Sequence, residues 1–288
     1  MPDLRWVTFW EIFYEIGRSY ISGTWLFDFS TLEGLAKGLV LCSIINMDLR
    51  RILEEIKLYL NPHKELLDLL IPGNTCYGTT WHTTKDEKLE RIKSLRIKKS
   101  YEDELSRTKN VSADQTALLE VKEALEEYKN ISLKWKKDEG NELDHMRKHR
   151  TLLFGGPVSN IYSEQLLKEF PLLNFNLQSP NYELIVGEER YEPDYDKNKR
   201  TYLSDYGVIV FKKYASFAPN GVIAFMGCHG YGTLAAAKVL TDHELSGVKK
   251  VAREVVRKLR AEHDFYVILE VEVDRGVIEK VNFVKAGP

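Results

Sequence analysis

The chain has 288 residues, 43% of them hydrophobic and 29% charged, with a formal net charge of −2. These values indicate a globular protein that is long enough for two domains, each with its own core. A net charge this close to zero argues against binding of nucleic acid by bulk electrostatics, so nucleic acid is not an expected partner, although a local basic patch is compatible with this charge.

Cysteine content and apolar stretches bear on the compartment. Cys42, Cys76 and Cys228 stand far apart without a C-x-x-C pair, which predicts neither a disulfide framework nor a zinc cluster and favours a reducing cytosol. The most apolar stretch, 34–45, contains Lys37 and is too short to span a bilayer. The N-terminus shows no signal-peptide pattern. We therefore expect a cytoplasmic protein with no membrane span.

Residues 1–150 are expected to be an all-helical region. Aromatic residues recur at helical spacing over 4–21 and apolar residues do so between 31 and 60, which predicts amphipathic helices over 1–72. From 85 to 150 nearly half of the residues are charged, in both signs, which predicts a charged, coiled-coil-like arm over 81–150. A basic run at 91–99 is flanked by acidic residues and is interpreted as a solvated face.

A short heptad pattern marks this arm between 112 and 135. Its seam positions are Leu118, Val121, Leu125, Tyr128, Ser132 and Trp135. About two heptads are compatible with a dimer-forming coiled coil or with an antiparallel hairpin folded against its own chain. A homodimer through 112–135 is thus one of two alternatives.

Two histidines stand at metal-ligand spacing at the end of the arm. His145 and His149 are four residues apart, with Glu142 and Asp144 close by in the sequence. No third convergent ligand is visible, so we predict no metal site.

Residues 151–288 are expected to form an α/β domain, because the charge density falls abruptly at Thr151. Short β-branched and aromatic runs predict strands at 151–154, 182–186, 206–214 and 222–226, with helices at 161–170 and 244–263 between and after them. The stretches 265–273 and 277–284 flank the turn Asp274-Arg275-Gly276 and predict a closing hairpin. The predicted fold class is α/β: a Rossmann-like, mostly parallel sheet with a C-terminal β-hairpin.

Two glycine loops follow predicted strands of this domain and mark the expected site. Glycines turn tightly and bare the backbone N–H groups, and a helix N-terminus attracts anions. Since both loops leave strands at the carboxyl end, we expect them to face each other. The expected ligand-binding residues are Gly155, Gly156, Ser159, Asn160, Gly227, His229, Gly230, Gly232 and Thr233.

The pair of loops resembles motifs of two protein groups. Gly155-Gly156-Pro157-Val158-Ser159-Asn160 and the later run 227–237 are similar to the G-G-P-x-A-N loop and the G-x-x-x-x-G-T-x-A-A motif in α/β domains of archaeal S-layer proteins. They also resemble the C-terminal sensor-like region of some actinobacterial helix-turn-helix regulators, which has a C-G-P loop, an aspartate-tyrosine stretch and G-I-H-x-x-G-x-x-G-A-A. Asp205-Tyr206-Gly207 lies at the middle position. The resemblance covers about 151–242 and implies a Rossmann-like domain without an established catalytic role; the N-terminal half matches neither group.

The glycine pattern also bears on which enzymatic functions are expected. It lacks the Lys-Ser/Thr pair of a P-loop and the acidic residue of a dinucleotide fingerprint, which disfavours ATP hydrolysis and hydride transfer. Our first hypothesis is a cytosolic sensor or regulatory protein that binds a small anionic or nucleotide-like ligand, with no cofactor. An alternative is a hydrolase or transferase on a nucleotide-type substrate, with His229 as acid/base and Cys228 or Asp205 assisting. A third is a structural or protein-interaction role, in which the glycines serve only tight packing.

Overall fold

The computed structural model describes residues 58–59, 61–71, 75–79, 113–129, 132–135, 142–178, 182–198, 201–261 and 263–288. The expectations for the helices over 4–60 and for the basic run at 91–99 lie almost entirely outside the described residues. Contacts divide the chain into two compact units, 1–65 and 66–288. α4 (Pro62–Leu70) crosses the boundary between the two, and the helices and strands from β1 onward belong to the second unit.

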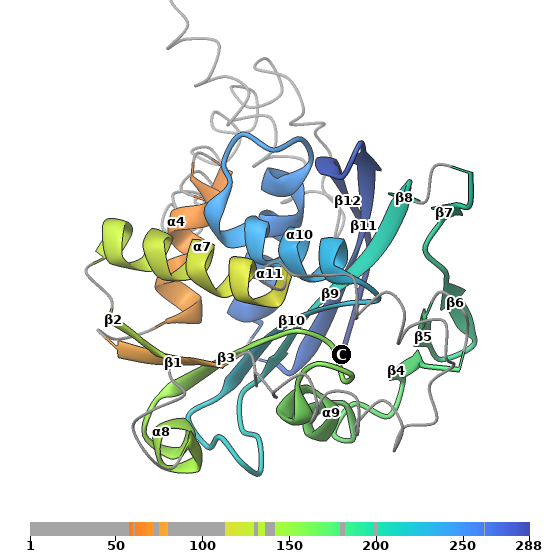
Figure 1. The fold of residues 1–288 in the computed structure, drawn as a ribbon. Helices are drawn as coiled ribbons and strands as arrows, with labels where there is room; N and C mark the ends of the chain where they lie inside the picture. The colour runs from red at the N-terminus through yellow and green to blue at the C-terminus, as the bar shows by residue number, and fades with distance from the viewer. Residues whose placement is uncertain are drawn as a thin grey trace, which may run out of the picture. The chain divides into compact units, whose positions relative to one another are not determined.

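The second unit is a mixed α/β fold built on one large sheet (Figure 1). The order of its strands is β12-β11-β9-β10-β3-β1-β2. Their bounds are β1 Thr75–Thr79, β2 Ser132–Trp135, β3 Arg150–Phe154, β9 Ser204–Lys212, β10 Val222–Gly227, β11 Phe265–Asp274 and β12 Val277–Gly287. Neighbouring pairs from β2 to β10 are parallel, while β9, β11 and β12 pair antiparallel with their neighbours. The α/β class and the closing hairpin are therefore confirmed, but three of the six strand pairs are antiparallel, so the prediction of a mostly parallel sheet is wrong.

The direction of winding reverses at β1. The chain leaves β1 through α7 (Ala113–Lys129) to β2 on one side, then returns through α8 (Glu142–Lys148) to β3 on the other side. Parallel crossovers are right-handed, so the two helices must cover opposite faces of the sheet. In open α/β sheets, ligands gather at the carboxyl ends of the strands beside such a reversal.

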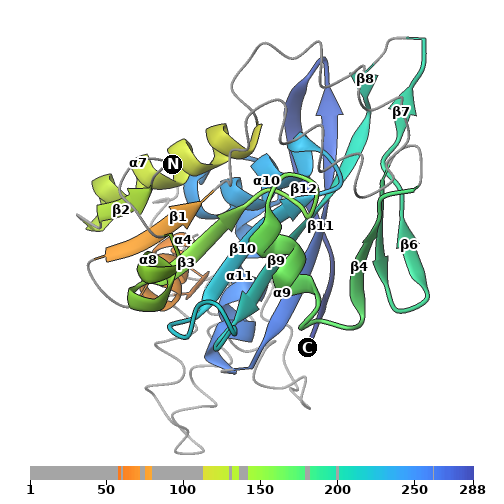
Figure 2. The same ribbon diagram turned by 60° about the horizontal axis from the view of Figure 1, so that its bottom comes forward.

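Helices cover both faces of the sheet. On one face α7 packs against α10 (Gly230–Thr241), and α11 (Val248–Arg260) lies over β11 and β12 (Figure 1). On the other face lie α8 and α9 (Ile161–Leu167) with a small antiparallel sheet (Figure 2). That sheet has the order β4 (Leu173–Asn176), β5 (Glu183–Val186) and β6 (Glu189–Tyr191). A two-stranded ribbon of β7 (Tyr195–Asp196) and β8 (Thr201–Tyr202) follows.

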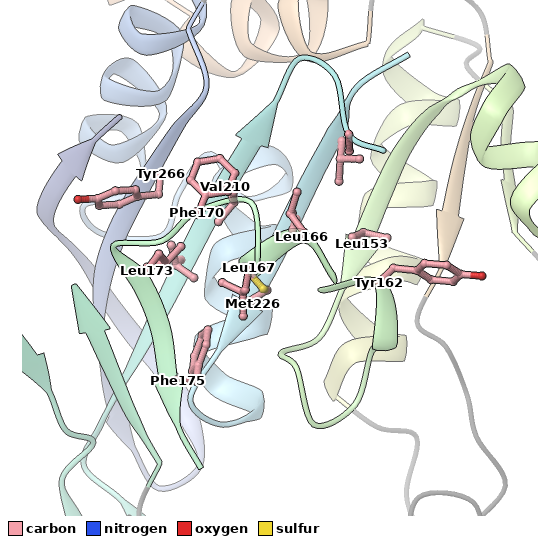
Figure 3. Close-up of a cluster of buried hydrophobic side chains, with 14 of the residues drawn as sticks. Leu153, Tyr162, Leu166, Leu167, Phe170, Leu173, Phe175, Val210, Met226 and Tyr266 are labelled. Carbon is pink, nitrogen blue, oxygen red and sulfur yellow. The ribbon is translucent and has the colours of Figure 1, made fainter. Parts of the chain in front are cut away.

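A single cluster of buried side chains joins the second face to the small sheet (Figure 3). Alternate residues of the central strands, such as Val208 and Val210 on β9 or Ala224 and Met226 on β10, point into it. The aromatic and aliphatic side chains of α9 and β4 close it from outside. Period-two alternation puts one set of strand residues here and the other set under α7, α10 and α11.

The expected domain boundary at 150/151 does not coincide with the boundary between the two units, which falls after Glu65. β1 and β2 lie in the region that we expected to be helical, yet they extend the same sheet as β3. Ser132 and Trp135, expected on a helical seam, belong to β2. Parallel pairing with β1 thus overrides the local heptad pattern.

The predicted heptad seam is covered by its own chain. Helix α7 carries the first half of the seam, and its seam residues Leu118, Val121 and Leu125 are completely buried, with α7 packed on α10. A dimer through these side chains would require them to leave that core. The second of the two sequence alternatives, packing within the chain, is the one that these residues adopt, although the partner element is α10.

The outer edge of β12 is covered by the turn between α10 and α11. Ser246 bridges Lys280 in parallel, and the Val281 N–H donates to the Ser246 carbonyl at 2.9 Å. Gly247, with φ 83°, lies so close that a Cβ atom there would overlap the Val281 carbonyl. Only glycine fits this position, because it combines a left-handed backbone with direct contact to another main chain.

Candidate functional site

The two glycine loops meet at the carboxyl ends of β3 and β10. A Cβ atom on Gly156 would lie 3.0 Å from the Gly227 carbonyl oxygen, so the loops face each other, as expected, and touch. The first turn of α7 reaches the same place, since a Cβ on Gly230 would lie 2.6 Å from that of Ala113. The two loops and the start of α7 are therefore in direct contact where the sequence suggested a ligand.

Asn160 fixes the first loop to two strands. Its side chain is fully buried and donates to the carbonyl oxygens of Thr79 at 3.2 Å and Phe154 at 3.1 Å. Its Oδ1 accepts from the Tyr162 N–H at 3.0 Å and so caps α9. The expected ligand contact of Asn160 is thus replaced by contacts that join β1, β3 and α9.

The space beside Gly155 is filled by side chains of the protein. Gly155 has φ 97°, and a Cβ atom there would overlap the Ser159 hydroxyl and lie 2.7 Å from Oδ2 of Asp114 on α7. Ser159 itself donates to the Gly156 carbonyl at 3.3 Å. A carboxylate in this position repels an anion, so the loop is poorly suited to phosphate.

Asp205 occupies the N-terminus of α10. Its buried carboxylate accepts from the backbone N–H groups of Gly232 at 2.6 Å, Tyr206 at 2.7 Å and His229 at 3.2 Å. Burial raises the pKa of Asp205 to about 7, and the three N–H groups oppose that rise. The positive end of α10 is therefore bound by a carboxylate from β9, where the sequence predicted an anionic ligand.

The glycines of the second loop permit backbone to contact backbone. A Cβ on Gly227 would overlap the Thr233 N–H, and a Cβ on Gly232 would overlap the Tyr206 carbonyl. Gly207 on β9 meets the Gly232 carbonyl in the same way. This packing by itself explains two glycines of the loop, Gly227 and Gly232, together with Gly207 on β9.

Cys228 is not placed as a nucleophile. The thiol is buried in the hydrophobic cluster, and burial raises its pKa well above the ordinary value, with the charge of Asp205 adding to the rise. A protonated thiol in an apolar site is a weak nucleophile. Since the carboxylate of Asp205 is already bound by three amides, neither proposed helper of His229 is available, and the hydrolase or transferase hypothesis gains no support.

The side chain of His229 lies among aromatic rings. The imidazole is half-buried and packs against Tyr202, with ring centroids 4.2 Å apart, and Tyr182, at 5.3 Å. Tyr195 and Tyr231 extend the group, with centroids 5.0 and 6.4 Å from that of Tyr202. We call these five residues the tyrosine–histidine cluster.

The tyrosines of this cluster come from four separate segments, so no sequence motif groups them. One backbone signal stands out in the structure: Tyr182 has φ 48°, a left-handed conformation that bulky residues rarely adopt. Such strain persists where surrounding contacts hold the residue in place, and it recurs in ligand clamps.

A second polar group lies at the end of β1. Glu142 on α8 accepts from the hydroxyls of Tyr77 at 3.3 Å and Tyr162 at 3.4 Å. Burial raises the pKa of Glu142, and the hydroxyl donors oppose that rise. His145 stacks on Tyr77 with centroids 5.2 Å apart and on His149 at 6.3 Å. Among the described residues no three potential ligands converge on a metal position.

An open groove of about 490 Å³ lies on the small sheet. Its lining residues are Asn174, Phe175, Asn176, Leu177, Gln178, Ile185 and Arg190. None of them belongs to either glycine loop, so sequence motifs gave no indication of it.

The chain matches no family model, and no significant match was found among curated proteins or solved structures. Its function must therefore be argued from its own geometry. In the part of the chain that the structure describes, no helix has the length and apolar character needed to cross a membrane.

Proposed function

We propose that the second unit is a Rossmann-like module that binds a small nucleotide-like ligand at the tyrosine–histidine cluster, in a sensor or regulatory role. The observation that carries the proposal is the half-buried imidazole of His229, which packs against two tyrosine rings at the N-terminus of α10. This position follows β10, at the sheet edge where ligands of α/β proteins gather.

The chemistry of the cluster suits a flat ring that carries an anionic group. Aromatic side chains stack on nucleobases, at about 1–3 kcal/mol per base. An imidazole and tyrosyl hydroxyls can donate hydrogen bonds to phosphate oxygens. Because Asp205 already accepts from the His229 and Gly232 amides, recognition would rest on side chains and not on the bare backbone of the loop.

Thermal shift and calorimetry with mononucleotides, dinucleotides and sugar phosphates test the proposal. A ligand at a hundred times its Kd should stabilise the folded state by about 2.7 kcal/mol. His229→Ala and Tyr202→Leu should abolish this shift, whereas His243→Ala, which changes an exposed histidine beyond α10, should preserve it. The proposal fails if no compound shifts the wild type, or if His243→Ala is as harmful as His229→Ala.

A second candidate is a structural or protein-interaction role. It is favoured by the direct contact between the glycine loops and by the three glycines explained by packing alone. The same ligand screen separates the two, because an interaction protein should show no stabilisation by any small anion while keeping a cooperative unfolding transition.

A further inference from the structure

The tip of the β11–β12 hairpin lies beside β8, the strand that carries Tyr202 of the tyrosine–histidine cluster (Figures 1 and 2). The Val273 N–H, just before the tip, donates to the carbonyl oxygen of Leu203 at 2.9 Å, and Leu203 directly follows Tyr202. At the tip itself, a Cβ atom on Gly276 would lie 3.4 Å from the hydroxyl oxygen of Tyr231, another member of the cluster. Two separate contacts therefore place the hairpin tip next to the cluster.

The tip presents an arginine side chain to solvent. The side chain of Arg275 is 92% exposed, and its ion-pair partner among the described residues is Asp274, at 3.8 Å. The Asp274 side chain is itself 72% exposed. An exposed pair at this distance is weak, because water and salt screen both charges. The guanidinium is therefore able to leave Asp274 for an anion that binds it more strongly.

The backbone at Arg275 favours a different residue. Arg275 and Gly276 have φ values of 49° and 81°, which is the pattern of a type I′ turn, in which both central residues are left-handed. Asn, Asp and Gly suit the first of these positions, whereas an arginine there carries the steric cost of the left-handed region. Formation of the turn therefore gives no reason for an arginine at this place.

The tyrosine–histidine cluster supplies stacking surfaces and hydrogen-bond donors, but none of its five residues carries a permanent positive charge. The His229 and Gly232 amides at the start of α10 are already bound by Asp205. A phosphate monoester carries about −1.5 to −2 charges at neutral pH, and a guanidinium binds it through two parallel N–H···O bonds. A phosphorylated ligand at this site would therefore need a cation from a neighbouring element.

We propose that Arg275 binds the phosphate of a nucleoside monophosphate whose base stacks in the tyrosine–histidine cluster. This role of Arg275 rests on the proposed function, because it names the class of ligand and adds a residue to the same site. The flexible stem of an arginine lets the guanidinium turn from Asp274 toward Tyr231, beside which Gly276 lies. Arg275 is then the residue that distinguishes the monophosphate from the free nucleoside.

The variant Arg275→Asn removes the cation and keeps the turn. Asn-Gly is a strongly favoured pair for a type I′ turn, so the variant should melt at the wild-type temperature or above it. The matched control is Arg147→Gln, which removes an exposed arginine of α8 with a similarly weak ion pair, to Asp144 at 4.0 Å. Circular dichroism and melting of both variants verify folding before binding is compared.

The test is isothermal titration calorimetry of the full chain with adenosine, guanosine, cytidine and uridine, and with the monophosphate of each. We expect the wild type to bind at least one monophosphate about tenfold or more tightly than its nucleoside, as one charge-assisted contact would give. Arg275→Asn should lose this factor for the monophosphate and bind the nucleoside unchanged. Added salt should weaken monophosphate binding to the wild type more than to the variant.

His229→Ala separates this role of Arg275 from the proposed function, because it should weaken binding of the nucleoside and of the monophosphate. The role of Arg275 alone is overturned if His229→Ala loses the monophosphate but Arg275→Asn binds it like the wild type. It is also overturned if the wild type binds nucleoside and monophosphate equally, or if Arg147→Gln loses as much affinity as Arg275→Asn. If none of these compounds binds the wild type, the role of Arg275 is overturned, and the sugar phosphates and dinucleotides of the wider screen decide the proposed function.

Discussion

Replacing Asp205 by Asn should remove a pH dependence from the stability of the α/β unit. The Asp205 carboxylate is completely buried, and burial raises its pKa from 3.8 to about 7. Between these two values the folded state therefore holds a proton that the unfolded state has released. Stability from this group is complete below about pH 4 and is lost as the pH rises to about 7.

The magnitude follows from linkage. Each pH unit inside this window changes the free energy of unfolding by about 1.36 kcal/mol for one group. From pH 5 to pH 7 the wild type should therefore lose about 2 kcal/mol relative to Asp205→Asn. The amide of Asn does not titrate, yet its oxygen can still accept from the Gly232 N–H that Asp205 binds.

The assay is urea denaturation of both proteins at half-unit steps of pH, followed by circular dichroism. Subtracting the two stability curves cancels every titration that they share. Carbon-13 NMR of the Asp205 carboxyl gives the pKa independently. A difference between the curves that stays flat, or grows in favour of the wild type as the pH rises, would refute the reasoning.

Four further changes probe the site and its surroundings. Gly155 has φ 97°, and a Cβ atom there would overlap two side-chain oxygen atoms, so Gly155→Ala should lower the free energy of unfolding by about 2 kcal/mol or more. Gly187 has φ 61° and open surroundings, so Gly187→Ala should lower it by only about 1 kcal/mol. Urea denaturation midpoints measure both changes. Asn160→Ala should cost about 3 kcal/mol in the same assay, because it removes a cap and two buried hydrogen bonds. Leu125→Asp should unfold the protein, because it places a charge in the buried contact between α7 and α10. If Leu125 instead served a dimer, the variant would be a folded monomer of half the mass; circular dichroism together with sedimentation distinguishes the two results. Cys228 should react with a thiol reagent at pH 8 only after unfolding, since burial raises its pKa.

The C-terminal half of the fold was largely readable from the sequence. The runs that became β9 to β12 are rich in β-branched and aromatic residues, and the hairpin turn at Arg275-Gly276 was expected. The helix α9 ends at Leu167, before the predicted 170, and α11 covers only Val248–Arg260 of the predicted 244–263, since Gly247 with φ 83° stands at its start. The local sequence pattern was enough to predict these elements, since the apolar residues of each strand or helix recur at the spacing of that structure.

β1 and β2 could not be read in this way. Tyr77 and Gly78 follow a turn-rich stretch, and Trp135 continues a heptad spacing. Both strands are short, and their identity comes from pairing with each other and with β3. Non-local pairing of this kind leaves little trace in the local sequence.

The sequence predicted where the two glycine loops lie, but not which side chains contact them. The glycine loops do lie at the edge of the sheet, yet the contacts of Asp114 with one loop and of Asp205 with the other come from distant elements. A glycine motif predicts the backbone conformation of a loop, but it does not predict which side chain from elsewhere in the chain contacts that loop. The tyrosines around His229 were missed for the same reason.

The turn at Ser246-Gly247 determines how far the large sheet can extend. β12 is the longest described strand and lies at one end of the strand order, and its Val281 N–H is already bound by Ser246. A second molecule that added a strand there would first have to displace this turn. Gly247→Val should displace the turn and expose the outer edge of β12. Light scattering should then show self-association that increases with protein concentration. One glycine far from the candidate site therefore lets this turn bind the outer edge of β12 at Val281.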